Sequence, residues 1–138
     1  MICLALGSNL GDRSGYLEQA RSLLAAQLHT DMRASRVLET EALGFDGPPF
    51  LNQVLAFESG IAPEALLDLC QAIEIQLGRE AHEACFDAVG RRVYANRTID
   101  IDILFMDDLQ LETDRLVLPH PQVEERPYIR QLLKDITI

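Results

Sequence analysis

One ten-residue segment restricts the fold more than any other part of the chain. Residues 96–105 read Asn-Arg-Thr-Ile-Asp-Ile-Asp-Ile-Leu-Phe, so isoleucine and aspartate alternate. Because successive side chains of a β-strand point to opposite faces, this pattern predicts a strand with one apolar and one acidic face. Carboxylates are unfavourable in strands, and Asp100 and Asp102 would lie about 7 Å apart along one face. The chain therefore needs a sheet that buries the isoleucines and a reason to keep two acids together.

The rest of the chain shows the periodicities of further strands and of helices. Proline in the first turn and Gly78 at the end delimit the second helix. The element order β-α-β-β-α-β predicts an α/β (α+β) fold, a ferredoxin-like sandwich with helices on one face of an antiparallel sheet. We expect long active-site loops and a small C-terminal hairpin and helix in addition. The expected strands are 1–6, 32–40, 50–58 and 97–105, with hairpin strands near 109–111 and 115–118, and the expected helices are 14–28, 62–77 and 127–134.

Length, charge and cysteine content exclude several classes of protein. A chain of 138 residues fits one domain over 1–138, and its net charge of −10 argues against a nucleic-acid binder. No apolar run is long enough to cross a membrane, and no signal peptide is apparent. Cys3, Cys70 and Cys85 have no paired spacing, which favours a reducing cytoplasm over disulfides or a zinc site. We expect a monomer.

Arginines surround the acidic strand and indicate what its acids bind. Arg91, Arg92 and Arg97 precede Asp100 and Asp102. Paired carboxylates suit hard cations such as Mg²⁺, and the guanidinium fork suits phosphate oxygens. Acids flanked by arginines are therefore typical of a metal–polyphosphate site, although a solvent-facing strand would show the same spacing. The loop over residues 79–96 is long for a compact domain, which favours a functional role.

Polar residues elsewhere have two interpretations each. Gln71 and Glu74 share the polar face of the second helix, where they could bind a ligand or simply face solvent. His120 stands between two prolines, where it could contact phosphate or mark a rigid turn. The loop over residues 7–11 could bind an anion through its backbone amides or form a tight turn.

These segments, in their order and spacing, resemble a known family. The matching residues are Ala5–Gly11, Thr40 with Leu43 and Gly44, Phe50–Asn52, Ile73 and Glu74 with Gly78 and Arg79, Arg97–Leu104, and Leu118–Pro121 with Arg126. The chain resembles the 6-hydroxymethyl-7,8-dihydropterin pyrophosphokinases of folate biosynthesis. The resemblance implies a ferredoxin-like fold and transfer of pyrophosphate from ATP to the pterin hydroxymethyl group, with release of AMP.

The resemblance also implies which residues form the site. Asp100 and Asp102 would hold two Mg²⁺ ions that bridge the ATP phosphates. The residues expected around ATP are Gln71, Glu74, Arg97, Ile103, Arg115, Leu116, His120 and Arg126. The residues expected around the pterin are Thr40, Leu43, Phe50, Asn52, Asp100 and Tyr128. No side chain stands out as a general base.

The chain departs from the family pattern in its loops. An arginine that commonly follows Arg79 is replaced by Ala81, and we expect Arg91 or Arg92 to take its place. A tryptophan common before the acidic strand is absent, and we expect Tyr94 to cover the pterin instead. Arg79, Arg91, Arg92 and Arg97 would then act with the two aspartates in catalysis.

Two other function classes fit parts of the pattern. A ferredoxin-like module could bind a metabolite without chemistry, but it would not need paired acids among arginines. A nucleotidyltransferase could also use two strand aspartates and Mg²⁺. Its products would differ, because it would release free pyrophosphate rather than AMP.

Overall fold

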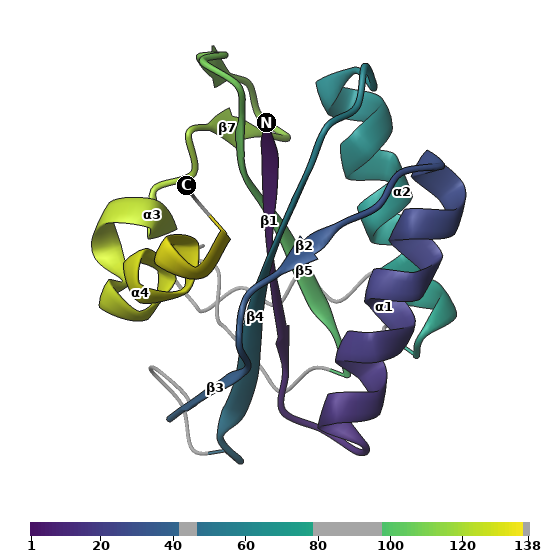
Figure 1. Ribbon diagram of the computed structural model, residues 1–138, viewed down its shortest axis with the longest axis vertical. Coiled ribbons are helices and arrows are strands. Elements are labelled where there is room, and N and C mark those ends of the chain that lie inside the picture. Colours follow the sequence, from purple (N-terminus) through teal and green to yellow (C-terminus); the bar gives the residue numbers. More distant parts are fainter. Residues whose placement is uncertain (42–46, 79–97, 137–138) are drawn as a thin grey trace.

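The computed structural model describes residues 1–41, 47–78 and 98–136 (Figure 1). The predicted order of the main elements is confirmed in these ranges. The elements are β1 (Ile2–Ser8), α1 (Arg13–Leu28), β2 (Arg33–Ala34), β3 (Leu38–Thr40), β4 (Phe50–Phe57), α2 (Pro63–Gln76), β5 (Asp100–Met106), β6 (Leu111–Glu112), β7 (Val117–Leu118), α3 (Gln122–Glu125) and α4 (Pro127–Ile136).

The main sheet is antiparallel and has β1 at its centre. Its order is β2-β4-β1-β5, and β3 also pairs with β4. The prediction of one strand over 32–40 is wrong, because that segment forms two short strands separated at Ser35. The Ser35 hydroxyl accepts a hydrogen bond from the backbone N of Val54 at 2.8 Å, and Gln53 Nε2 donates to the Ser35 carbonyl at 2.9 Å. These side-chain bonds replace part of the regular ladder.

Helices lie on both sides of this sheet (Figure 1). The larger apolar cluster includes Leu4 and Leu6 of β1, Ile101 and Ile103 of β5, and the buried apolar residues of α1 and α2. The smaller cluster lies on the second face, where Cys3 and Ala5 of β1 contact the buried side of α4. The sequence predicted helices on one face of the sheet, and α4 covers part of the other face. Asp100 and Asp102 alternate with the isoleucines, so they belong to this second face.

Local signals explain where the two long helices begin and end. The Asp12 carboxylate caps α1 by accepting a hydrogen bond from the backbone N of Gly15 at 3.1 Å. Pro63 occupies the first turn of α2. A backbone N–H at this position would have no partner within the helix, so proline removes no helical hydrogen bond. Gly78 follows that helix with φ of +111°, a conformation that side chains with a Cβ rarely adopt.

The C-terminal region contains the predicted hairpin and helix, with changed bounds. The hairpin strands are β6 and β7, and the final helix α4 extends to Ile136. The single-turn helix α3 was not predicted. Among the described helices, none has the length and apolarity that a membrane crossing requires. Cys3 and Cys70 are buried free thiols, and burial raises the pKa of Cys3 to about 12. Cys85 lies outside the described residues.

Candidate active site

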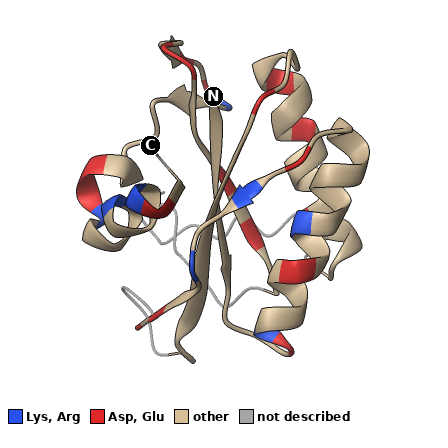
Figure 2. Cartoon of the chain, in the orientation of Figure 1, with Lys and Arg blue, Asp and Glu red and all other residues tan. Residues whose placement is uncertain are grey.

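The two aspartates interrupt an otherwise uncharged sheet centre. The long strands β1 and β4 carry no charged residue, whereas β5 begins with Asp-Ile-Asp (Figure 2). Asp100 and Asp102 are half-buried, and the isoleucines between and after them are buried. The apolar face anchors β5 in the core, and the acidic face remains accessible to a ligand.

Glu74 of α2 holds the backbone between the two aspartates. Its side chain is only 4% exposed, and its Oε2 accepts a hydrogen bond from the backbone N of Ile101 at 2.9 Å. Burial of a carboxylate is costly unless it is hydrogen-bonded, so this contact fixes α2 against the strand. The solvent-facing interpretation is therefore wrong for Glu74, whereas Gln71 on the same helix is exposed.

A second contact reaches Asp102 from the segment before α4. Gln122 Nε2 donates to Asp102 Oδ2 at 3.3 Å, and the backbone N of Gln122 donates to His120 Nδ1 at 3.1 Å. The backbone N of His120 in turn donates to the Leu104 carbonyl at 2.7 Å. Because Nδ1 of His120 accepts a hydrogen bond, the ring proton of the neutral imidazole lies on Nε2. Gln122 was not predicted, since a glutamine in a one-turn helix shows no sequence signal.

The residues expected around the pterin gather at the ends of β3 and β4. Asn52 is 7% exposed, and its Nδ2 donates to Thr40 Oγ1 at 2.8 Å and to the Leu38 carbonyl at 3.1 Å. Nδ2 also lies 3.4 Å from the Phe50 carbonyl, so the amide nitrogen is directed toward β3 and the start of β4, and Oδ1 lies on the side of Gly7. The Phe50 ring also borders Gly7, because its Cδ1 would lie 3.5 Å from a Cβ there.

The strand register joins these residues to the acidic pair. Gly7 of β1 lies opposite Asn52 on one side and opposite Asp100 on the other. Residues directly opposite each other in antiparallel strands share one face of the sheet. Asp100, Gly7 and Asn52 therefore form one row, so the expected metal site and the expected pterin site adjoin.

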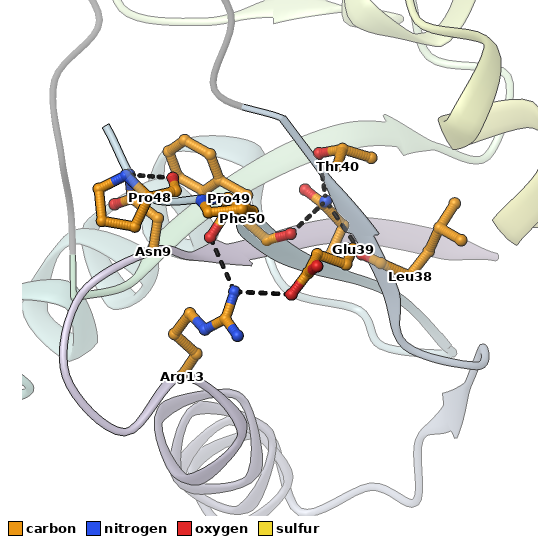
Figure 3. A network of polar contacts seen from close by, with 9 residues as sticks. Asn9, Arg13, Leu38, Glu39, Thr40, Pro48, Pro49 and Phe50 are labelled. Atoms are coloured by element: carbon orange, nitrogen blue, oxygen red, sulfur yellow. Dashed lines mark hydrogen bonds and ion pairs between the residues drawn. The ribbon is translucent and has the colours of Figure 1, made fainter. Parts of the chain in front are cut away.

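Arg13 at the start of α1 supports the same end of the sheet (Figure 3). Its Nη1 donates to Glu39 Oε2 at 3.0 Å and to the Pro49 carbonyl at 2.9 Å. Nearby, Asn9 Nδ2 donates to the Pro48 carbonyl at 3.1 Å. These contacts hold β3 and the start of β4 against the first helix. Sequence reasoning missed Arg13, because a lone arginine in a first helical turn is typical of a solvent-exposed position.

The residues expected around ATP occupy two places. Arg115 lies next to α2, where its Nη2 contacts Asp68 Oδ1 at 2.6 Å, one turn before Gln71. This hydrogen bond raises the pKa of the Arg115 guanidinium above its usual value. The side chains of Leu116 and Ile103 are buried in the core between these elements.

The second group of expected ATP residues lies near α4. Arg126 Nη1 donates to the Tyr128 hydroxyl at 2.9 Å, which joins an expected ATP residue to an expected pterin residue. His120 lies at the beginning of this segment, within two residues of Gln122. The remaining expected site residues are outside the described ranges: Leu43, Arg79, Arg91, Arg92, Tyr94 and Arg97.

Comparison with known proteins identifies the family. The model of the 7,8-dihydro-6-hydroxymethylpterin-pyrophosphokinase (HPPK) family matches residues 3–138. The chain belongs to the HPPK family. It is therefore an ATP-dependent pyrophosphokinase of folate synthesis, which transfers pyrophosphate from ATP to hydroxymethyldihydropterin.

Curated relatives agree with this family over nearly the whole chain. A 2-amino-4-hydroxy-6-hydroxymethyldihydropteridine pyrophosphokinase of Porphyromonas gingivalis is 40% identical over 138 residues, covering 99% of this chain and 90% of the relative. The enzyme of the same name from Bacillus subtilis is 36% identical, covering 96% of this chain and 75% of the relative. A folate synthesis bifunctional protein of Arabidopsis thaliana is 33% identical, over 98% of this chain but 26% of its own length.

Asn52 gives a first test of the expected pterin side of the site. Asn52→Ala should weaken pterin binding by about tenfold or more, because the Oδ1 acceptor on the side of Gly7 is removed. It should also lower the free energy of unfolding by about 1–3 kcal/mol, since Thr40 and Leu38 lose a donor. Pterin titration in the presence of a non-hydrolysable ATP analogue measures the first effect.

Gln53→Ala is a matched control for this substitution. Gln53 is also a buried amide that donates to a backbone carbonyl, but it follows Asn52 along β4 and therefore lies on the opposite face. The Gln53→Ala variant should be less stable than wild type but should bind the pterin with wild-type affinity. Equal losses of pterin affinity in both variants would contradict a direct role for Asn52.

Proposed function

We propose that the pyrophosphate transfer occurs over the row Asp100, Gly7 and Asn52 on the second face of the sheet. The observation that carries this proposal is the register of β5, β1 and β4, which sets the acidic pair beside the Asn52 amide. The pterin hydroxyl oxygen bonds to the β-phosphorus of ATP as the bond from that phosphorus to the α–β bridging oxygen breaks. AMP leaves with the bridging oxygen, and the hydroxyl proton is released.

The acidic pair fits two Mg²⁺ ions. Asp100 and Asp102 are half-buried carboxylates on one face of the sheet. Within the described ranges, no group of three or more histidine, cysteine or acidic side chains is arranged to hold a metal. Mg²⁺ is commonly held by one or two carboxylates, with water and substrate phosphates as further ligands. When bound, the ions would neutralise phosphate charge and polarise the reacting phosphoryl group.

The chain's own residues supply alignment. Glu74 and Gln122 fix the acidic pair through Ile101 and Asp102, and Asn52 orients the pterin through Oδ1. The Phe50 and Tyr128 rings offer stacking faces for the pterin. Phosphoryl transfer requires little covalent participation by the protein, so alignment and charge neutralisation account for most of the rate.

The remaining assignments extend the proposal around these residues. ATP is bound on the α2 side by Gln71, Glu74, Arg115, Leu116 and Ile103, and near α4 by His120 and Arg126. Arg79, Arg91, Arg92 and Arg97 neutralise phosphate charge, and Thr40, Leu43 and Tyr94 complete the pterin site. The proposed setting is a cytoplasmic monomer that binds neither nucleic acid nor membrane.

A product assay tests the proposal. The protein is incubated with ATP, Mg²⁺ and 6-hydroxymethyl-7,8-dihydropterin, and nucleotides and pterins are separated chromatographically. We expect AMP and pterin diphosphate in equal amounts, with no AMP when the pterin or Mg²⁺ is omitted. AMP formation without the pterin, or a nucleotidyl pterin with free pyrophosphate, would contradict the proposal.

A further inference from the structure

Gln122 is a buried amide in a segment that is otherwise polar and exposed. It is the first residue of the single-turn helix α3 and is only 8% exposed, whereas Glu124 and Glu125 of the same turn are exposed. An apolar side chain would fill a buried position at lower cost, because a buried amide must have its hydrogen-bonding groups satisfied. The partner of the Gln122 amide therefore explains why a glutamine stands here, and that partner is Asp102.

A closed circuit of contacts fixes the Gln122 amide relative to β5. The Leu104 carbonyl, two residues after Asp102 on that strand, accepts a hydrogen bond from the backbone N of His120 at 2.7 Å. The His120 ring accepts through Nδ1 from the backbone N of Gln122 at 3.1 Å. Gln122 Nε2 then donates to Asp102 Oδ2 at 3.3 Å, which returns the circuit to the same strand. Two hydrogen bonds that the Gln122 side chain does not make therefore place it beside Asp102.

The direction of this contact indicates its role. An ionised carboxylate only accepts hydrogen bonds, so the amide presents its N–H to Asp102. A bond to one carboxylate oxygen restricts rotation of the whole group about its Cβ–Cγ bond. Residues that hydrogen-bond a metal-ligating side chain orient it, and their loss commonly lowers metal affinity by about 10- to 100-fold. Gln122 stands in this relation to Asp102, which belongs to the proposed metal pair.

A second buried glutamine shows what a purely structural amide looks like in this fold. Gln53 is 6% exposed, and its Nε2 donates to the Ser35 carbonyl at 2.9 Å on the opposite face of the sheet. Most N–H···O bonds are about 2.7–3.2 Å long, so the Gln53 bond is of ordinary strength, whereas the 3.3 Å bond of Gln122 adds little to stability. The two glutamines therefore separate a stabilising role from a positioning role.

We propose that Gln122 is a positioning residue that holds the Asp102 carboxylate in the orientation that binds a divalent cation. This inference rests on the proposed function, because it takes Asp102 as a metal ligand. Gln122 acts only through Asp102 and touches neither substrate nor metal. Loss of its N–H should therefore weaken metal binding in a protein that remains folded.

The test is Gln122→Met, with Gln53→Met as the matched control. Methionine has a similar length and flexibility but no N–H donor, so each substitution removes one hydrogen bond and keeps most of the packing. Mn²⁺ serves as the probe, because it suits the same oxygen ligands as Mg²⁺ and free Mn²⁺ is measured by electron paramagnetic resonance. Mn²⁺ is titrated into wild type, both methionine variants, Asp102→Ala and the double variant Asp102→Ala/Gln122→Met, and Tm is recorded for each.

Gln122→Met should raise the dissociation constant for Mn²⁺ by about tenfold or more, with a Tm close to that of wild type. Gln53→Met should show the reverse, a lower Tm with wild-type Mn²⁺ affinity. In the Asp102→Ala background, Gln122→Met should weaken Mn²⁺ binding no further, because the residue through which it acts is absent.

Three results would overturn the inference and leave the proposed function standing. They are unchanged Mn²⁺ affinity in Gln122→Met, equal losses of Mn²⁺ affinity in the two methionine variants, and a further loss of Mn²⁺ affinity in the double variant relative to Asp102→Ala. If Asp102→Ala bound Mn²⁺ as tightly as wild type, the metal assignment of the proposed function would be overturned, and this inference with it.

Discussion

Asp102→Ala and Asp100→Ala should each reduce kcat by about 1,000-fold or more, because each removes a charge that stabilises the transferring phosphates through the proposed metal ions. The fold should survive, since both side chains are half-buried on the second face and the isoleucines of β5 remain in the core. The variants should also need more Mg²⁺ for half-maximal activity. Initial rates over a Mg²⁺ titration, with thermal unfolding of each variant, measure these effects.

Asp108→Ala provides the control for the aspartate variants. Asp108 is an exposed acid in the turn after β5, away from the paired row. It should retain wild-type kcat and Mg²⁺ dependence, although it removes the same charge from the chain. Asp102→Asn keeps an oxygen that can accept from Gln122, so activity lost in that variant is due to charge rather than to the hydrogen bond. Near-wild-type rates in both alanine variants would contradict the metal assignment.

Glu74→Ala should lower both stability and turnover. It leaves the buried N–H of Ile101 without the carboxylate acceptor observed at 2.9 Å, a loss of about 1–3 kcal/mol in the free energy of unfolding. It also frees the backbone between Asp100 and Asp102, and a small misplacement of reacting groups can reduce turnover by about 100-fold. Denaturant unfolding and steady-state kinetics measure the two effects separately.

Glu74→Gln distinguishes a positioning role from a role of the charge. The glutamine keeps an oxygen that can accept from Ile101, so we expect it to recover most of the lost kcat and stability. Gln76→Ala, an exposed position on the same helix, should behave as wild type. If Glu74→Gln were as damaging to kcat as Glu74→Ala while both remained folded, the positioning role would be contradicted.

The fold was predictable where burial produces a clear period. The apolar stripe of α2 and the alternation in β5 follow directly from which faces meet the core. Asp12, Pro63 and Gly78 delimit their helices through local hydrogen bonding and backbone conformation alone. Such signals need no knowledge of distant residues, which is why they can be read from one sequence.

Other features depend on contacts between distant segments and leave no local pattern. Ser35 divides the strand expected over 32–40 because its hydroxyl bonds to Val54 of β4. Glu74 looks like a solvent-facing residue in its helix and is buried only because β5 presents an edge N–H to it. Gln122 and Arg13 join elements more than fifteen positions away, and neither stands in a motif.

The candidate site also combines features that one sequence predicts with features that depend on distant contacts. Asp100 and Asp102 could be identified from their alternation and from the arginines before them. The alignment of Asn52 and Gly7 with Asp100 could not be predicted in this way. It depends on the register between separate strands, which sequence periodicity does not determine. Recognition of the family supplied the substrates, and the register indicates that the two expected halves of the site adjoin.

Labelled ATP tests the central claim most directly. Two parallel incubations with Mg²⁺ and 6-hydroxymethyl-7,8-dihydropterin use ATP labelled either at the α-phosphate or at the γ-phosphate. The account predicts that the γ label appears in the pterin product and the α label in AMP. Recovery of the α label on the pterin, with the γ label in free pyrophosphate, would contradict it.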